Sequence, residues 1–261
     1  MARSMKWCLT ALVAVFLSAC GGGGGGERPT SPTARCGTLG LTPKIVNGTE
    51  CAYSPSSPVV PVLIQSASGQ IGLCSGTVLS PNRILTAAHC ISAGTRRIGI
   101  PVLLSNGTTA DVLASRWVLH PGFRIQSDGF YNDAAVVTLS GPLPNPNMAL
   151  LISDPAAVGQ SVFIAGWGEP VYDIVAGNAR LSIVNSAHVG YAYTGRDSNT
   201  CRGDSGGPLY RNIGGRMGLL GITSTGTAPN CGENDLALFT NIQTPEVLNF
   251  IRAQAPEAQV F

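Results

Sequence analysis

Charged residues are scarce in this 261-residue chain, making up only 11% of the sequence. From Ile45 onward there is no lysine, and eleven arginines stand against thirteen acidic residues, so the +2 of the whole chain becomes −2 for this portion. Proteins that bind nucleic acid present a basic stripe or patch to the phosphates. The sequence has no such stripe, so we expect no nucleic-acid partner.

The sequence also lacks the patterns that hold metals and cross membranes. It has no C-x-x-C pair and no paired His-Cys spacing, which argues against a zinc site. Beyond the N-terminal leader, no run approaches the ~20 apolar residues that a membrane helix needs. Glycine (33 residues) and proline (18 residues) are frequent instead, which favours β-sheet and loops over helices.

The first residues have the pattern of a secretory leader. Arg3 and Lys6 precede the apolar run from Leu9 to Leu17, which ends in small residues. This pattern predicts a signal peptide over residues 1–19 and a mature protein outside the cytoplasm. The sequence Leu17-Ser-Ala-Cys20 resembles the lipobox of bacterial lipoproteins, which implies lipidation of Cys20. An ordinary secreted protein, cleaved nearby, is the alternative.

Residues 20–35 contain six consecutive glycines followed by prolines, serines and threonines, a composition typical of a flexible tether. We therefore expect contact with a membrane only through the anchor at Cys20. Cys8 is lost with the signal peptide, and disulfides persist outside the cytoplasm. Six cysteines then remain, and they allow 15 pairings that the spacing alone does not resolve. They are Cys36, Cys51, Cys74, Cys90, Cys201 and Cys231.

From Ile45 the chain consists of short apolar runs, rich in β-branched residues and broken by turn residues, which predicts an all-β sandwich or barrel. The three prolines of Gly141-Pro-Leu-Pro-Asn-Pro146 cannot continue a strand and divide the chain into halves of similar length. A helix is expected over residues 244–255, with Thr244 as its cap and a buried face of Val247, Leu248 and Ile251. The ten predicted strands are 59–64, 72–79, 98–104, 111–119, 134–139, 161–165, 179–184, 208–210, 218–223 and 236–240.

Ser205 stands among glycines in Cys201-Arg-Gly-Asp-Ser-Gly-Gly-Pro208, where Gly203 and Gly206 can let the chain turn tightly and direct consecutive N–H groups to one point. An alcohol becomes a useful nucleophile when a base, a carboxylate that orients the base and backbone N–H donors surround it. A glycine-rich hairpin turn with an incidental serine is the alternative.

Three histidines are candidates for the base. His89 is expected at the end of an apolar strand and lies beside Cys90, which a disulfide could hold in place, so it is the preferred candidate. His120 precedes Pro121 and Gly122 and is expected in a surface loop, and His188 is expected in a strand. Asp133 opens the run 134–139, where a carboxylate is costly to bury unless donors such as a histidine N–H surround it. Its alternative role is to cap a turn.

Five motifs, in this order, resemble those of the trypsin-like serine proteases: Ile45-Val-Asn-Gly48, Thr86-Ala-Ala-His-Cys90, Asn132-Asp-Ala-Ala-Val136, Gly166-Trp-Gly168 and Gly203-Asp-Ser-Gly-Gly-Pro208. The resemblance covers about residues 45–255. It implies two antiparallel six-stranded β-barrels, over about 45–145 and 146–243, with a C-terminal helix and a cleft between the barrels. It also implies a serine-type endopeptidase (class EC 3.4.21) with His89, Asp133 and Ser205 as catalytic residues, and with the N–H groups of Gly203 and Ser205 as the oxyanion hole.

The same resemblance implies a precursor. Cleavage after Lys44 by a protease specific for basic residues would remove a propeptide, residues 36–44, and free the Ile45 amine to pair with Asp204. The implied disulfides are Cys74 with Cys90, Cys201 with Cys231 and Cys36 with Cys51.

The primary pocket is implied to have Asn199 at its floor, with Ser224, Gly226 and Ala237 around it. A neutral amide and the methyl of Ala237 predict small to medium uncharged side chains in protein or peptide substrates. We expect no cofactor and no calcium, because only one acid lies near Arg96 to Asp111. Two other functions remain open: a catalytically silent surface protein that binds or adheres, and an esterase with the same triad.

Overall fold

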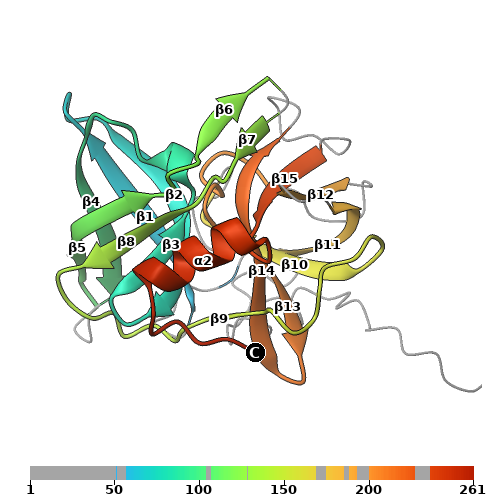
Figure 1. Ribbon diagram of the computed structural model, residues 1–261. Coiled ribbons are helices and arrows are strands. Elements are labelled where there is room, and N and C mark those ends of the chain that lie inside the picture. The colour runs from blue at the N-terminus through green and yellow to red at the C-terminus, as the bar shows by residue number, and fades with distance from the viewer. Residues whose placement is uncertain are drawn as a thin grey trace, which may run out of the picture.

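The computed structural model describes residues 51, 57–103, 107–127, 129–168, 175–184, 188–192, 200–226 and 236–261. In the first half of the chain, six strands form a closed antiparallel barrel in the order β1-β2-β3-β8-β5-β4 (Figure 1). These strands are β1 (Val59–Ser66), β2 (Ile71–Ser80), β3 (Arg83–Thr86), β4 (Thr95–Leu103), β5 (Thr109–Leu119) and β8 (Ala135–Leu139).

The interior of this barrel is filled by alternating residues of its strands. In β4, Ile98, Ile100 and Val102 are buried, whereas Arg96 and Arg97 are exposed. Ile84 of β3 and Val137 of β8 pair in register and belong to the same core. Burial of such side chains at a period of two drives closure of the sheet.

The second half contains a seven-stranded sheet in the order β13-β10-β11-β12-β15-β14-β9. Strand β13 pairs with β14 as well as with β10. The first and last strands of the series β13-β10-β11-β12-β15-β14 are therefore hydrogen-bonded to each other. The strands are β9 (Ala149–Leu150), β10 (Ser161–Gly166), β11 (Val175–Val184), β12 (His188–Ala192), β13 (Pro208–Ile213), β14 (Arg216–Gly226) and β15 (Leu236–Asn241).

Two short elements of the first half lie next to the candidate site. A 3-10 helix, η1 (Ala88–Cys90), follows β3 directly. A small hairpin of β6 (Arg124–Gln126) and β7 (Gly129–Tyr131) precedes β8. Both elements bring the end of one barrel strand toward the second half of the chain.

All ten predicted ranges overlap strands of the structure, and five strands lie outside those ranges: β3, β6, β7, β9 and β12, of which β12 contains His188, the histidine expected in a strand. They are two to five residues long, too short to show a clear alternation. The proline-rich segment 141–146 contains no strand, as expected, and lies between β8 and β9.

Helix α2 (Pro245–Gln254) confirms the predicted C-terminal helix, with two corrections. Thr244 occupies the cap position, but its hydroxyl donates to the Asn241 carbonyl at 3.0 Å and caps no N–H of the helix. Phe250 is buried in the core with Val247 and Ile251, whereas Leu248 is only half-buried. The apolar face is therefore rotated toward Phe250.

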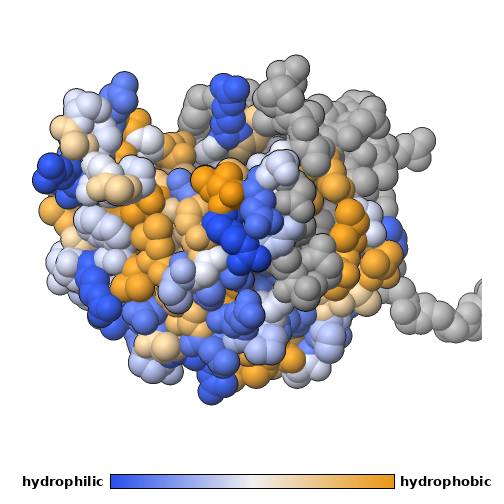
Figure 2. All heavy atoms as spheres, turned by 45° about the horizontal axis from the view of Figure 1, so that its top comes forward, coloured by the Kyte–Doolittle hydropathy of each residue, from blue (hydrophilic) through white to orange (hydrophobic). Residues whose placement is uncertain are grey.

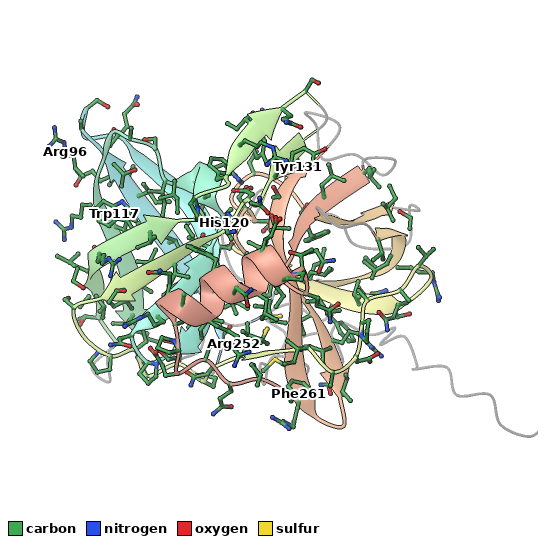
Figure 3. The ribbon with its side chains drawn as sticks, viewed as in Figure 1. Arg96, Trp117, His120, Tyr131, Arg252 and Phe261 are labelled. Atoms are coloured by element: carbon green, nitrogen blue, oxygen red, sulfur yellow. A yellow bond between two sulfur atoms is a disulfide. The ribbon has the colours of Figure 1, made fainter. Side chains whose placement is uncertain are left out.

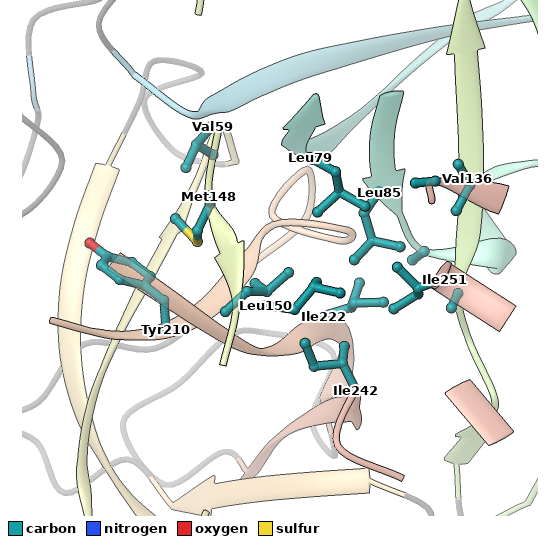
Figure 4. Packing of buried hydrophobic residues seen from close by; sticks show 14 of the residues in the cluster. Val59, Leu79, Leu85, Val136, Met148, Leu150, Tyr210, Ile222, Ile242 and Ile251 are labelled. Atoms are coloured by element: carbon teal, nitrogen blue, oxygen red, sulfur yellow. The ribbon is translucent and has the colours of Figure 1, made fainter. Parts of the chain in front are cut away.

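One hydrophobic cluster joins the two halves and the helix (Figure 4). Leu85 and Val136 from the barrel, Ile222 and Leu150 from the second half, and Ile251 of α2 all belong to it. This shared core fixes the ends of β3 and β8 against β14, where the candidate site lies. Within the described ranges, no helix is long and apolar enough to cross a membrane.

Candidate active site

The carboxylate of Asp133 is fully buried and accepts three hydrogen bonds. Oδ1 accepts from the His89 backbone N–H at 2.8 Å, and Oδ2 lies 2.6 Å from His89 Nδ1. Oδ2 also accepts from the Ser224 hydroxyl at 2.6 Å. Because an ionised carboxylate only accepts hydrogen bonds, this contact puts the ring proton of neutral His89 on Nδ1. Nε2 is then free to act as a base.

The partners of Asp133 come from both halves of the chain. His89 belongs to η1, beside the disulfide between Cys74 and Cys90. Ser224 lies in β14, and the Thr240 hydroxyl of β15 donates to the Asp133 backbone carbonyl at 3.2 Å. The packing of the two halves therefore fixes the orientation of the histidine.

Residues 201–207 form a loop before β13, which we call the Ser205 loop. This loop fits tightly between the halves because Gly206 has no side chain. Gly206 has a φ of +87°, and a Cβ there would lie 2.2 Å from Thr86 Oγ1 and 2.3 Å from the Ser75 carbonyl oxygen. The Gly206 N–H donates to the Thr223 carbonyl at 2.8 Å, and the Ser75 N–H donates to the Ser205 carbonyl at 2.7 Å. One loop is thereby hydrogen-bonded to β14 and to β2.

The sulfur of Cys90 lies close to both Ser205 and His89. It is 4.0 Å from His89 Nε2 and 3.9 Å from the Ser205 carbonyl oxygen. No hydrogen bond joins Ser205 Oγ to His89 Nε2 in the described part of the chain. Such bonds are often long before substrate binds and tighten in the complex.

The backbone N–H groups of Gly203 and Ser205 have no hydrogen-bond acceptor among the described residues. The neighbouring N–H groups of Asp204, Gly206 and Gly207 all donate to backbone carbonyls. Free donors beside a nucleophile can stabilise an oxyanion.

The Asp204 carboxylate is bound by backbone N–H groups of the second half. It accepts from the Gly168 N–H and from the Cys201 N–H, each at 2.8 Å. Burial raises the pKa of Asp204 from its ordinary value of 3.8 to about 6, although these two hydrogen bonds lower it. No described residue supplies a cation to it.

The proposed pocket residues lie in two paired strands, as far as they are described. Gly226 of β14 pairs with Ala237 of β15, and Ala237 is buried in the core of the second half. The Ser224 hydroxyl contacts Asp133 rather than a pocket. Asn199, the predicted floor, lies outside the described residues.

Several other predicted residues also lie outside the described ranges: Cys20, Cys36, Lys44, Ile45 and Cys231. Cys51 and Cys201, the predicted partners of Cys36 and Cys231, are disulfide-bonded. In the described ranges, no group of three His, Cys, Asp or Glu side chains is arranged to hold a metal ion.

The expectation that His120 lies on the surface is wrong. His120 is buried beside the start of α2 (Figure 3). Its Nδ1 accepts from the Gly122 N–H at 3.0 Å, its Nε2 lies 3.3 Å from the Glu246 carbonyl oxygen, and its ring packs edge-on against Phe250. The turn at Pro121 is real, but helix α2 covers it. His188 lies in β12, as expected.

Two residues of the site were not predicted. Phe130 of β7 packs its ring against His89, with centroids 5.1 Å apart, and Phe123 supports it edge-on. Ser75 of β2 is fully buried and contacts the Ser205 loop. The aromatic residues of 123–131 could have signalled the first contact, but nothing in the sequence signals the second.

Comparison with known proteins identifies the family. The model of the Trypsin family matches residues 45–251. Human kallikrein-12 is 32% identical over 226 residues, which cover 75% of this chain and 84% of the kallikrein. A trypsin from Xenopus laevis is 31% identical over 194 residues (65% and 76%), and a bacterial trypsin from Saccharopolyspora erythraea is 31% identical over 178 residues (59% and 75%). The chain belongs to the trypsin family of serine-type endopeptidases.

Proposed function

We propose that Ser205, His89 and Asp133 are the catalytic triad of this endopeptidase. The observation that carries the proposal is the buried Asp133 carboxylate, which lies 2.6 Å from His89 Nδ1. The Cys90 sulfur lies 4.0 Å from His89 Nε2 and 3.9 Å from the Ser205 carbonyl oxygen, so His89 and Ser205 are near neighbours. His89 takes the Ser205 proton while Oγ attacks the peptide carbonyl, and gives this proton to the leaving amine. Asp133 holds the tautomer and stabilises the imidazolium. Water then hydrolyses the acyl-enzyme by the same route.

The N–H groups of Gly203 and Ser205 are proposed as the oxyanion hole. Their lack of an acceptor among the described residues supports this role, since both are free to donate to the charged oxygen of the tetrahedral intermediate. Each such donor contributes on the order of 3 kcal/mol in the transition state.

The chain is proposed to be made as a precursor that is cleaved after Lys44 by a protease specific for basic residues. The support is Asp204, a buried carboxylate whose two hydrogen bonds do not offset its desolvation. A buried charge without an opposite charge is strongly unfavourable. The new ammonium of Ile45 would supply the opposite charge and order the adjacent Gly203 and Ser205 donors.

The substrates are proposed to be proteins or peptides with a small to medium uncharged residue before the cleaved bond. The support is the neutral side chain of Asn199, which the family resemblance assigns to the pocket floor, and the methyl group of Ala237, whose strand pairs with Gly226. Replacing Asn199 with aspartate should therefore move cleavage toward arginine and lysine. Self-activation at Lys44 is not expected.

The second half is proposed to form a second six-stranded barrel, because β13 pairs with both β10 and β14. The mature protein is proposed to act outside the cytoplasm, held to the bacterial envelope by lipid at Cys20 or secreted. The N-terminal sequence pattern alone supports this location.

A peptide-library assay tests the activity. The wild-type protein cut after Lys44 should hydrolyse peptides, and the matched Ser205→Ala protein should not. Turnover of esters with no cleavage of any peptide would favour the esterase. Loss of both activities in the cut wild type would favour the silent binding protein.

A further inference from the structure

Ser75 connects the first barrel to the Ser205 loop with its hydroxyl as well as its backbone. The side chain is fully buried in β2. Its hydroxyl accepts from the Trp167 N–H at 2.9 Å and donates to the Gly203 carbonyl at 2.8 Å. Both hydrogen-bonding roles of this hydroxyl are therefore used on residues 92 and 128 positions away.

These bonds hold the chain on both sides of the free donors. Ser75 binds the Gly203 carbonyl with its hydroxyl and the Ser205 carbonyl with its N–H. The peptide between Gly203 and Asp204 lies between the two free N–H groups. Gly203 has a φ of +95°, and a Cβ there would lie 2.8 Å from Gly168 Cα, so only glycine fits against the segment that Ser75 also binds. The bond from Ser75 to the Gly203 carbonyl and the bond from the Asp204 N–H to the Cys201 carbonyl (3.1 Å) together orient the peptide plane between the two donors.

Ser75 also links this loop to the segment that holds Asp204. The Trp167 N–H donates to Ser75 Oγ, and the next N–H, of Gly168, donates to the Asp204 carboxylate. Two consecutive amides are thus bound by a barrel hydroxyl and by the proposed activation residue. A change at Asp204 would reach the donors through the same amides.

We propose that Ser75 is a positioning residue, whose hydroxyl orients the oxyanion donors Gly203 and Ser205. The inference rests on the proposed function, because it assumes that these donors stabilise the transition state. Without the hydroxyl, the peptide plane between Gly203 and Asp204 would keep the bond from the Asp204 N–H to the Cys201 carbonyl (3.1 Å) but lose its bond to β2. Donors that are less well preorganised lose part of their effect.

A purely structural role is the competing explanation, and Ser57 provides the matched control. Ser57 is also fully buried, and its hydroxyl also accepts one backbone N–H (Val59, 3.0 Å) and donates to one backbone carbonyl (Val59, 3.1 Å). None of these atoms belongs to the Ser205 loop. Ser75→Ala and Ser57→Ala therefore remove the same number of hydrogen bonds from equally buried positions.

The test measures kcat and KM of each protein after the same cleavage at Lys44, per active site titrated to completion with a fluorophosphonate. Ser75→Ala should lower kcat about 10- to 100-fold with KM nearly unchanged. The affinity for a peptide boronic acid inhibitor, whose adduct has an oxygen at the oxyanion position, should fall by a similar factor. Ser57→Ala should lower the melting temperature without changing kcat. Equal kcat values for wild type and Ser75→Ala would overturn the inference.

Ser75→Thr and Ser75→Val give a second comparison should Ser75→Ala fail to fold. These side chains have the same shape and differ in the hydroxyl. The kcat of Ser75→Thr should be at least about tenfold higher than that of Ser75→Val. Equal kcat values for these two variants would overturn the inference. A wild type that hydrolyses no peptide would instead overturn the proposed function, and this inference with it.

Discussion

Asp204 is the residue whose environment the proposed cleavage after Lys44 would change directly, because the new amine would pair with its carboxylate. In the structure its carboxylate is desolvated and accepts two amide hydrogen bonds. Its pKa is therefore raised to about 6, so the folded chain binds its proton more tightly than the unfolded chain does. The stability of the uncut chain must then depend on pH through this residue.

We expect Asp204 to destabilise the uncut chain progressively as pH rises from about 4 to about 6. Because the folded pKa lies above the unfolded value of 3.8, this effect is absent below pH 3.8 and complete above about 6. At pH 8, uncut Asp204→Asn should be more stable than wild type by up to about 3 kcal/mol, and at pH 4 the difference should largely vanish.

Urea unfolding of both proteins across this pH range measures that difference. Asp111→Asn is the control, because Asp111 lies on the barrel surface with 41% of its side chain exposed. Parallel stability curves for wild type and Asp204→Asn would contradict the assignment of a raised pKa.

Asp133→Asn should abolish most activity while the protein stays folded. The amide oxygen would accept from the His89 backbone N–H, so the NH2 group would donate to His89 Nδ1 and the ring proton would move to Nε2, the wrong tautomer. In a relative of this chain the same change lowers kcat about ten-thousandfold, and we expect a similar loss here. Ser224→Ala removes only one donor to this carboxylate and should cost far less. Equal losses for the two variants in kcat would show that His89 orientation is not the cause.

At the residue scale, the sequence predicts side chains with distinctive chemistry and misses those with ordinary chemistry. His89 and Asp133 lie together in the structure, as expected from a buried acid that needs donors. Ser75 could not be found, because a serine in a strand has no distinctive pattern and its partners lie about a hundred residues away. His120 was misplaced because a turn motif does not show that a distant helix covers it.

At the scale of elements, helix α2 connects the C-terminus to the barrel. Val247 and Ile251 enter the shared core, and the Arg83 side chain of β3 donates to the Gln254 carbonyl at 3.1 Å. His120 contacts the Glu246 carbonyl at the other end of the helix. The helix is therefore held at both ends and along its apolar face (Figures 1 and 4).

Ile251→Ala should lower the free energy of unfolding by about 2–5 kcal/mol, because it leaves a cavity in the fully buried cluster. Asn249→Ala, on the exposed face of the same helix, should change it by less than about 0.5 kcal/mol. Urea unfolding at pH 7 compares the two variants. Equal effects would contradict the packing of α2 described above.

The sequence predicts long strands reliably and short strands poorly. Strands of six or more residues with β-branched side chains, such as β1 and β5, were all anticipated. The four residues of β3 fall outside the ten predicted ranges, although an apolar strand was expected before His89 and β3 pairs with both β2 and β8. Its place is set by partners distant in sequence, which local periodicity does not reveal. The buried face of α2 includes Phe250 rather than Leu248 for the same reason, since Phe250 packs against His120, which lies far from it in the sequence.

At the scale of the whole molecule, the site forms where the two halves meet. His89 and Asp133 come from the first half, and Ser205, Ser224 and Thr240 come from the second. The surface near the β6–β7 hairpin is a mixture of apolar and hydrophilic side chains (Figure 2), and Ile125 of β6 is 65% exposed. Because the site takes residues from both halves, small shifts of one half against the other would change its geometry directly.

Cleavage after Lys44 should act on the molecule as a switch. We expect the cut protein to hydrolyse peptides at least about a hundredfold faster than the uncut protein, since ordering one oxyanion donor alone gives a change of that size. Lys44→Gln should block activation by a lysine-specific protease and keep the protein in the slow state. A fully active uncut chain would contradict the role proposed for Asp204.

The most direct test of the central proposal is to identify the residue that a fluorophosphonate modifies in the protein cut after Lys44. Mass spectrometry should find one adduct per molecule, on Ser205, with no adduct in Ser205→Ala and strongly slowed labelling in His89→Ala. An adduct on another residue, or no adduct on folded and fully cut wild-type protein, would contradict the proposal that Ser205 is the nucleophile.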